Sequence, residues 1–316
     1  MTDGFATGDG MADGTLAIGD DGFAEAVMES DGALGEKARG GNGAWIRGEV
    51  AEASTILAVR NLAHANAVAE PAHPRSGTLY LRFGKRALDI ALSGIALLLT
   101  LPINVVLAVL TYRDVGSPIL YVQERTGRGL KSFKMVKFRN MTEERDEAGE
   151  LLPPEDRITK LGLFVRSHSL DELLNFWSVF KGDMSLIGPR PLPVEFTPHM
   201  TERHKARYAV RPGLECPRVG DEEPKAGIDY AHARFENDVD YVESVSLATD
   251  VRLAFKLVKL VLGRSGSGDS TGTDSHFAGY DSDGRAMSLG RLKDPACYRR
   301  EILGIDDEDA EGEGAE

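Results

Sequence analysis

The longest apolar run of the chain covers residues 87–112, with Asp89, Asn104 and a few hydroxyl side chains as its polar exceptions. About 20 apolar residues are enough to cross a bilayer, so the run predicts a membrane helix. Pro102 lies near its middle and removes one backbone hydrogen-bond donor. The pattern therefore predicts a helix that is broken or kinked at Pro102.

Basic residues flank this run on both sides, with Arg82, Lys85 and Arg86 before it and Arg113 after it. Positive charge at a helix end favours the cytoplasmic face of the membrane. A re-entrant helix-break-helix, which enters and leaves by one leaflet, places both ends on that face. A single spanning helix with a mild kink is the alternative, because proline is also common in spanning helices.

A second membrane candidate is Ser246–Leu262, where apolar and basic positions follow helical spacing. The basic side chains Arg252, Lys256 and Lys259 share one face, and Val251, Phe255, Val258 and Leu262 line another. Such a basic amphipathic helix suits the headgroup region of a membrane. A helix that packs on the core and keeps a solvated basic edge fits the same pattern.

Between these segments, alternating apolar and polar positions predict short strands. One covers Ile119–Gln123 and runs into a glycine-containing basic turn, and another covers Phe133–Arg139. The period of two places Lys137 and Arg139 on the same face of the second strand. Two cations on one face can bind a diphosphate, and a merely solvated strand face is the alternative.

Two adjacent carboxylates, Asp171 and Glu172, follow Ser169. Ser169 with Glu172 three residues later is a capping-box pattern, so a helix is predicted to begin near Ser169. Acidic residues in a first helical turn are stabilised by the helix dipole, which also lowers the pKa of such a carboxylate. Beyond this structural role, an ionised aspartate can attack phosphorus, and a carboxylate pair can hold Mg²⁺.

Two further cations lie near this pair in the sequence. Arg166 precedes it, and Arg190 follows in a Gly188-Pro189-Arg190-Pro191 turn that can direct a guanidinium back toward the carboxylates. Such cations can neutralise charge on a transferring or leaving phosphate. His168 is a weaker candidate, because a histidine at this position is by default a surface residue.

The composition narrows the class of partner. The formal net charge of −13 argues against nucleic-acid binding. Residues 81–142, however, hold ten Lys and Arg against three acids. Because this basic segment adjoins the apolar run, anionic lipid headgroups or a phosphorylated substrate are better partners.

The acidic excess lies mainly near the ends. Residues 1–80 are rich in Gly, Ala and Asp, and residues 263–316 are rich in Gly, Ser and Asp, so both predict largely disordered extensions. A short helix within Val50–Ala69 is the exception. The two cysteines, Cys216 and Cys297, have neither disulfide-framework nor zinc-site spacing. The N-terminal residues lack the basic-then-apolar pattern of a signal peptide.

Several collinear motifs resemble the bacterial polyprenyl-phosphate sugar phosphotransferases, the monotopic phosphoglycosyl transferase family. The resemblance covers about residues 81–262 and rests on the joint order and spacing of the motifs. They are Lys85-Arg86-x-x-Asp89, Gly116-Ser117-Pro118 through Gln123-Glu124-Arg125-x-Gly127, Lys137-Phe138-Arg139-x-Met141, Ser169-Leu170-Asp171-Glu172-Leu173, Gly182-Asp183-Met184-Ser185-Leu186-Ile187-Gly188-Pro189-Arg190-Pro191, Arg211-Pro212-Gly213 and Tyr241-Val242-Glu243-x-x-Ser246-Leu247.

The resemblance implies transfer of a sugar 1-phosphate from a UDP-sugar to undecaprenyl phosphate, with release of UMP. It implies that Asp171 and Glu172 are the catalytic dyad, that Asp171 is the nucleophile of a ping-pong cycle, and that Mg²⁺ is bound at the dyad. The substrate-binding positions it implies are Lys137, Arg166 and Arg190, with Arg139 beside them. It also maps a re-entrant membrane helix onto residues 82–112, with the break at Pro102.

Three positions depart from the family pattern. Glu215 through Asp221 replace a Thr-Gly start and a Gln-Val-Asn-Gly-like stretch, which affects expected nucleotide or sugar contacts. Leu174 stands where proline commonly follows the dyad. About 80 hydrophilic residues precede the motifs, where large members of the family carry several spanning helices.

Together these observations predict a predominantly helical α/β enzyme embedded in the cytoplasmic face of a bacterial inner membrane. The expected organisation is an extension (1–80), a re-entrant helix (81–113), a catalytic domain with short strands and interfacial helices (114–262) and a tail (263–316). The expected role is initiation of exopolysaccharide or O-antigen-type glycan assembly, with a homodimer left open. A catalytically silent scaffold and a Mg²⁺-dependent nucleotide-sugar hydrolase are the alternatives.

Overall fold

The computed structural model describes residues 57, 59–147, 149, 152, 154–221, 227–263 and 276–304. Helices dominate this part of the chain. The α-helices are α3 (Leu62–Val68), α4 (Lys85–Val115), α5 (Pro154–Arg157), α6 (Lys160–Ser167), α7 (Asn175–Lys181), α8 (Glu202–Lys205), α9 (Tyr230–Ser244), α10 (Leu247–Gly263), α11 (Leu289–Leu292) and α12 (Pro295–Tyr298). Short segments of 3₁₀ or π geometry are η1 (Tyr80–Gly84), η2 (Arg128–Leu130), η3 (Leu170–Glu172), η4 (Val194–His199), η5 (Ala206–Ala209) and η6 (Arg299–Leu303).

The strands form separate two-stranded sheets. They are β1 (Leu120–Thr126), β2 (Ser132–Phe138), β3 (Ser185–Ile187), β4 (Gly213–Glu215), β5 (Phe277–Tyr280) and β6 (Ala286–Ser288). β1 pairs with β2 and β5 with β6 in antiparallel fashion, whereas β3 and β4 are parallel. The predictions of a mostly helical protein and of strands near 119–123 and 133–139 are confirmed.

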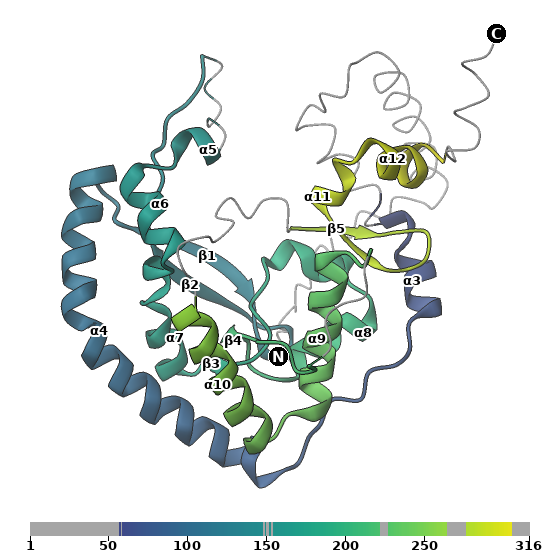
Figure 1. Ribbon diagram of the computed structural model, residues 1–316, viewed down its shortest axis with the longest axis horizontal. Helices are drawn as coiled ribbons and strands as arrows, with labels where there is room; N and C mark the ends of the chain where they lie inside the picture. Colours follow the sequence, from purple (N-terminus) through teal and green to yellow (C-terminus); the bar gives the residue numbers. More distant parts are fainter. Residues whose placement is uncertain are drawn as a thin grey trace, which may run out of the picture.

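The apolar run forms one long helix. Helix α4 continues from η1, and together Tyr80–Val115 is long and apolar enough to cross a membrane by length and composition. Its helical backbone is continuous through Pro102, so the predicted interruption at this residue is absent from the described helix. Figure 1 shows that α4 is bent, and its two arms curve around one side of the molecule. Proline is a common cause of such a bend, because it cannot donate to the preceding turn.

Helix α4 has its polar side inside the protein. Lys85, Asp89 and Ser93 follow one another at intervals of four residues and are buried, whereas Leu98 and Leu99 are 75% and 70% exposed. Residues four apart share one helix face, so a polar stripe contacts the protein and an apolar surface faces outward. This is the reverse of a soluble surface helix, and so large an apolar surface is typical of a membrane contact.

The stripe fixes α4 to the rest of the fold. The Lys85 ammonium forms a 2.6 Å ion pair with Asp250 of α10 and donates to the Ile187 carbonyl at 2.9 Å. The Asp89 carboxylate accepts hydrogen bonds from the Ser185 hydroxyl at 2.9 Å and the Leu186 N–H at 3.0 Å. The motif Lys85-Arg86-x-x-Asp89 therefore attaches the apolar helix to β3 and does not line the candidate active site described below.

Helix α10 confirms the predicted amphipathic helix. It packs on the core with one face, as one interpretation predicted, and exposes apolar side chains that suit a membrane surface, as the other did. Leu253 is fully buried in the core, while Phe255 is 73% exposed next to exposed Val251 and Val258. The basic residue Lys256 points inward, because its ammonium donates to the Gly220 carbonyl at 3.0 Å. The outward surface of α10 thus combines exposed apolar side chains with the exposed basic residues Arg252 and Lys259.

The structure corrects the prediction for the C-terminal extension. Composition predicted a disordered tail over 263–316, but residues 276–304 form the β5–β6 hairpin, α11, α12 and η6, which we call the C-terminal lobe. The polar turn Asp281–Gly284 closes the hairpin, with the Asp281 carboxylate accepting from the Arg285 N–H at 2.7 Å. Tyr280 and Met287 are buried on the strands. The high Gly, Ser and Asp content of 263–316 as a whole concealed the apolar residues that flank this turn.

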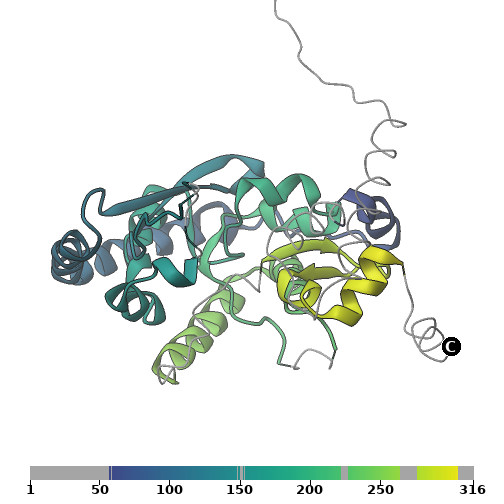
Figure 2. The same ribbon diagram turned by 90° about the horizontal axis from the view of Figure 1, so that it is seen from above.

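Helix α3 packs on this lobe, as Figure 2 shows from above. Leu57 and Ala65 are fully buried in two core clusters that also contain lobe residues. The Asn61 side-chain amide donates to the Tyr280 carbonyl at 2.8 Å. A short helix within 50–69 is therefore confirmed, and it is part of a folded unit rather than an isolated helix in a disordered extension.

This packing leads to a truncation prediction. Because α3 covers the lobe, deletion of residues 1–75 is expected to destabilise residues 276–304, although the sequence predicts a largely disordered extension over 1–80. Loss of buried leucine-sized side chains costs about 2–5 kcal/mol each. Limited proteolysis of the detergent-solubilised truncation should cut within 276–304 faster than in the full chain. Equal protection would contradict this role of α3.

Candidate active site

The two candidate carboxylates lie in the 3₁₀ turn η3 rather than in an α-helix. The predicted capping box is wrong: Ser169 has a left-handed backbone (φ 54°) and makes no side-chain cap, and the following helix α7 begins only at Asn175. A left-handed non-glycine residue costs about 1–2 kcal/mol and is common at functional turns. The turn directs Asp171 and Glu172 to one side, toward strand β2.

Glu172 is held by two cations from different parts of the chain. Its Oε1 accepts from the Lys137 ammonium of β2 at 2.6 Å and from the Arg190 guanidinium. Burial alone would raise the pKa of Glu172, but Arg190 and Lys137 together hold the pKa below its ordinary value. Glu172 is therefore a fixed, ionised group whose charge is already compensated.

Asp171 has a different environment. The residue is only 5% exposed, and within the part of the chain that the structure describes it forms no ion pair. Burial raises the pKa of Asp171, with Lys137 opposing and Glu172 adding to the shift. The expectation that a helix dipole would lower this pKa is wrong, because no helix begins here. A carboxylate with a raised pKa is more basic and more nucleophilic when it is ionised.

Close backbone contact between two glycines places Arg190. A Cβ on Gly188 would lie 2.8 Å from the Arg211 carbonyl oxygen, and one on Gly213 would lie 2.2 Å from the Gly188 nitrogen. Only glycine fits such an approach, which lets β3 and β4 pair. Behind this contact the Arg207 guanidinium donates to the Arg190 carbonyl at 2.7 Å. The Gly-Pro-Arg-Pro turn thus directs the Arg190 guanidinium to Glu172, as its sequence suggested.

The dyad opens into a cavity of about 790 Å³. All six residues that the sequence singled out for catalysis or substrate binding line it, namely Lys137, Arg139, Arg166, Asp171, Glu172 and Arg190. Pro102 lies elsewhere, in α4, and His168 is an exposed residue that is not among the lining residues. The cavity thus brings together four segments that are separate in sequence.

The cavity is strongly basic although the chain is acidic. Among the described residues eight arginines and lysines line it against four acids. Four of these cations were not predicted: Arg125, Arg145, Arg157 and Arg234. Arg125 stands in a quoted motif, but the other three carry no motif or strand pattern that distinguishes them from surface cations. A cavity of this size and charge suits a phosphorylated ligand.

The atypical segment 215–221 also reaches the cavity. Glu215 lines it and lies 3.5 Å from the Arg190 guanidinium. Cys216 is next to it, and burial raises the pKa of its thiol well above the ordinary value. The departure from the family pattern therefore places an additional carboxylate beside Arg190, and the thiol remains protonated.

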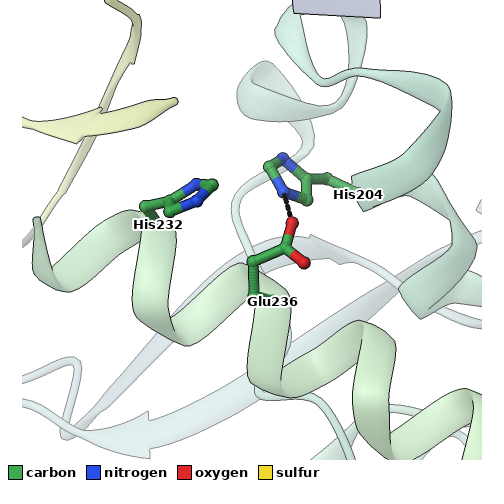
Figure 3. Close-up of side chains that lie close together, drawn as sticks. All are labelled: His204, His232 and Glu236. Carbon is green, nitrogen blue, oxygen red and sulfur yellow. Dashed lines mark hydrogen bonds and ion pairs between the residues drawn. The ribbon is translucent and has the colours of Figure 1, made fainter. Parts of the chain in front are cut away.

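A second cluster of titratable residues lies away from the cavity. Figure 3 shows His204 of α8 with His232 and Glu236 of α9, three residues whose ligand atoms lie within 4.8 Å of one another. The Arg203 guanidinium, however, already binds the Glu236 carboxylate through both oxygens, and the His204 Nε2 contacts it at 2.9 Å. These contacts lower the pKa of Glu236 to about 2 against the opposing effect of burial.

Hydrogen bonds account for both ring nitrogens of His204 and for Nδ1 of His232. The Tyr280 hydroxyl accepts from the Thr201 N–H at 2.9 Å and lies 2.8 Å from His204 Nδ1, so it can donate there and leave Nε2–H for Glu236. His232 Nδ1 accepts from the Ala286 N–H at 3.3 Å. This proton assignment needs no cation. The cluster is a polar contact of α8 and α9 with the C-terminal lobe.

Known proteins resemble this chain in the region that contains the candidate active site. A sequence profile described as "Bacterial sugar transferase" matches residues 80–264, more than half of the chain. The uncharacterized sugar transferase EpsL of Bacillus subtilis is 40% identical over 148 residues, which are 47% of this chain and 72% of that protein.

Two other relatives have names that state a reaction. A UDP-N-acetylgalactosamine-undecaprenyl-phosphate N-acetylgalactosaminephosphotransferase of Aeromonas hydrophila is 33% identical over 185 residues, 57% of this chain and 44% of its own length. A UDP-glucose:undecaprenyl-phosphate glucose-1-phosphate transferase of Caulobacter vibrioides is 30% identical over 189 residues, 56% of this chain and 69% of its own. The chain thus spans less than half of the length of the Aeromonas relative.

Proposed function

The chain belongs to the bacterial sugar transferase family, and from this premise we propose that it transfers a sugar 1-phosphate from a UDP-sugar to undecaprenyl phosphate, releasing UMP. The names of the Aeromonas and Caulobacter relatives describe this reaction. The observation that carries the proposal is the cavity, which joins the Asp171–Glu172 pair to Lys137, Arg166 and Arg190. A neutral ligand would not require so many cations.

The first step is attack of an Asp171 carboxylate oxygen on the phosphorus that carries the sugar. The bond from this phosphorus to the bridging oxygen breaks, and UMP leaves with the electron pair. A phosphate oxygen of undecaprenyl phosphate then attacks the same phosphorus and releases the carboxylate. The two substrates use one site in turn, so a single basic cavity serves both.

Lys137 and Arg190 have supporting roles in this scheme. Both bind Glu172 in the structure and line the cavity, so they can also contact phosphate oxygens of the donor. Arg166 lines the same cavity and can compensate charge on the transferring phosphate. Glu172 holds the first two cations in place, and its lowered pKa keeps it ionised during the cycle.

The dyad also fits Mg²⁺. Carboxylate oxygens are the ligands that this ion prefers in proteins, and Asp171 and Glu172 offer them at the edge of the basic cavity. When bound, Mg²⁺ would shield the repulsion between the carboxylates and the diphosphate. The other contacts described above do not depend on it.

The exposed apolar side chains of α4 and α10 support a position at a membrane. The polyprenyl acceptor presents its phosphate only at a bilayer surface, so the cavity must lie at that surface. We propose the cytoplasmic face of a bacterial inner membrane, with α4 entering and leaving one leaflet through its bend at mid-length. The Lys85 and Arg113 ends then lie on the same side.

The test is UMP release from a panel of UDP-sugars by the detergent-solubilised full chain, with and without undecaprenyl phosphate and Mg²⁺. Release that requires lipid and metal is the expected result, and the active donor would identify the sugar and suggest the exopolysaccharide or O-antigen pathway. Lipid-independent release would instead indicate a nucleotide-sugar hydrolase. No release from any donor would favour a silent scaffold of glycan assembly.

The pH dependence gives a further prediction. A nucleophilic carboxylate works only when ionised, so kcat/KM should fall as the pH drops through the pKa of Asp171. Because burial raises this pKa, the acid limb should lie above the ordinary aspartate value of about 3.9. Lys137 lowers the same pKa, so Lys137→Met should move the limb to higher pH. A limb that stays in place in this variant would argue against Asp171 as the titrating group.

A further inference from the structure

The C-terminal lobe lies beyond residue 264, where the family match ends, yet it contacts the helix that carries one wall of the cavity. Helix α9 contributes Tyr230 and Arg234 to the cavity lining. These residues are four apart and therefore share one face of the first turns of the helix. Tyr230 is 60% exposed, so its ring is free to pack against a bound molecule.

The lobe holds the segment that leads into this helix. The Asp229 carboxylate caps α9 by accepting from the Ala231 N–H at 2.7 Å, and its second oxygen accepts from the Ser288 hydroxyl of β6 at 2.8 Å. The Arg291 guanidinium of α11 donates to the Gly227 carbonyl at 3.1 Å. Two lobe side chains thus bind the backbone and the cap on either side of Ile228, directly before Tyr230.

Apolar contacts also join the C-terminal lobe to α9. Phe277 and Tyr280 of the lobe belong to one buried cluster with Phe235 of α9 and with Leu192, which lies two residues after Arg190. Burial and three cations of the cavity wall, Arg125, Arg166 and Arg234, lower the pKa of His276 at the start of the lobe. The lobe therefore packs against α9 and against the segment that follows Arg190.

We propose that the C-terminal lobe is a positioning element for the nucleotide-sugar donor: through Ser288 and Arg291 it fixes the first turn of α9, so that Tyr230 and Arg234 contact the donor in the cavity. An aromatic ring packs on the flat face of a sugar or base, and a guanidinium binds its phosphate or hydroxyl oxygens. The inference rests on the proposed function, because it takes the donor to be a UDP-sugar. Ser288 and Arg291 act through α9 and do not themselves contact the ligand.

The experiment compares Ser288→Ala and Arg291→Gln in the full chain with two matched controls. Ser288→Thr keeps the hydroxyl, and Arg300→Gln removes a lobe arginine that pairs with Glu301 and not with α9. The first readout is hydrogen exchange of residues 227–236 without ligand, which should become faster in the two test variants only. The second is the dissociation constant for UDP and for the active UDP-sugar, measured by calorimetry.

Loss of one such hydrogen bond should weaken donor binding about three- to tenfold. The decisive comparison repeats Ser288→Ala in a Tyr230→Ala/Arg234→Gln background. There it should have no further effect on donor binding, because the residues through which it acts are gone. The KM for undecaprenyl phosphate should not change in Ser288→Ala.

Additive losses in that background, or unchanged exchange of 227–236, would overturn the proposal and leave the lobe a general stabiliser. If the wild-type chain binds UDP but transfers no sugar phosphate, the proposed transferase activity fails while the positioning role is still judged by exchange and binding. If it binds neither UDP nor any UDP-sugar, both proposals fail.

Discussion

Asp171→Asn should lower sugar-phosphate transfer by about a thousandfold or more, since an amide cannot form the covalent intermediate. The substitution conserves shape, and Asp171 is not part of an ion pair among the described residues, so the fold and membrane association should persist. Asp240→Asn, at an exposed position of α9, is the matched control and should retain activity. The measurement is radiolabelled sugar phosphate transferred to undecaprenyl phosphate.

The same pair of variants tests the intermediate directly. Wild-type protein and the Asp240→Asn control, incubated with donor and without lipid acceptor, should gain the mass of a phosphosugar on the peptide that contains Asp171. Asp171→Asn should gain none. Normal turnover by Asp171→Asn, or an adduct elsewhere in the chain, would remove Asp171 as the nucleophile.

Arg207→Met should be the most destabilising single change near the site. Arg207 and Asp238 form a 2.8 Å ion pair with side chains only 1% and 2% exposed. Removing the cation leaves a buried carboxylate unpaired, which costs about 3–5 kcal/mol. For a chain of this size the unfolding temperature should fall by about 10 °C. Arg207 also supports the Arg190 carbonyl, so activity should fall with stability.

The pH dependence of this defect has a definite sign. Burial raises the pKa of Asp238 even with Arg207 present, and removal of Arg207 should raise that pKa further. A group with a raised pKa in the folded state contributes stability at low pH, where it is protonated, and loses it as the pH rises. The defect should therefore be smaller at pH 5 than at pH 8 in thermal unfolding. Arg207→Met/Asp238→Asn should recover part of the loss, and an equal defect in the double variant would contradict the ion-pair explanation.

The contrast between Lys137 and Arg234 explains which site residues the sequence could predict. Lys137 stands on a strand with alternating apolar and basic positions. A period of two was therefore enough to infer that its side chain shares one strand face with that of Arg139. Arg234 lies on a helix whose cavity-facing side depends on how α9 packs against the lobe. No local pattern contains that information, because the packing joins residues that are far apart in the sequence.

Ser169 and Gly213 show a similar difference for the backbone. The sequence around Ser169 matches a helix cap, but tertiary contacts place the residue in a left-handed turn and make a 3₁₀ turn of the dyad. Gly213 follows Arg-Pro in a recognisable motif. Why this position requires glycine is visible only in the fold, where its Cα lies against the Gly188 backbone. Local sequence patterns marked both positions as structurally constrained. They did not predict the left-handed backbone of Ser169 or the close contact of Gly213 with Gly188.

The union of α3 with the C-terminal lobe has a consequence for the order of folding. The hydrogen bond from Asn61 to Tyr280 joins residues 219 positions apart, so α3 leaves the ribosome long before its partner exists. During that interval Leu57 lacks the buried cluster that the lobe supplies, while the membrane helix and the catalytic segment can already assemble. The lobe should therefore join α3 after the catalytic segment has assembled. A ribosome-stalled chain ending before residue 276 is then expected to contain the assembled dyad, with Leu57 still exposed.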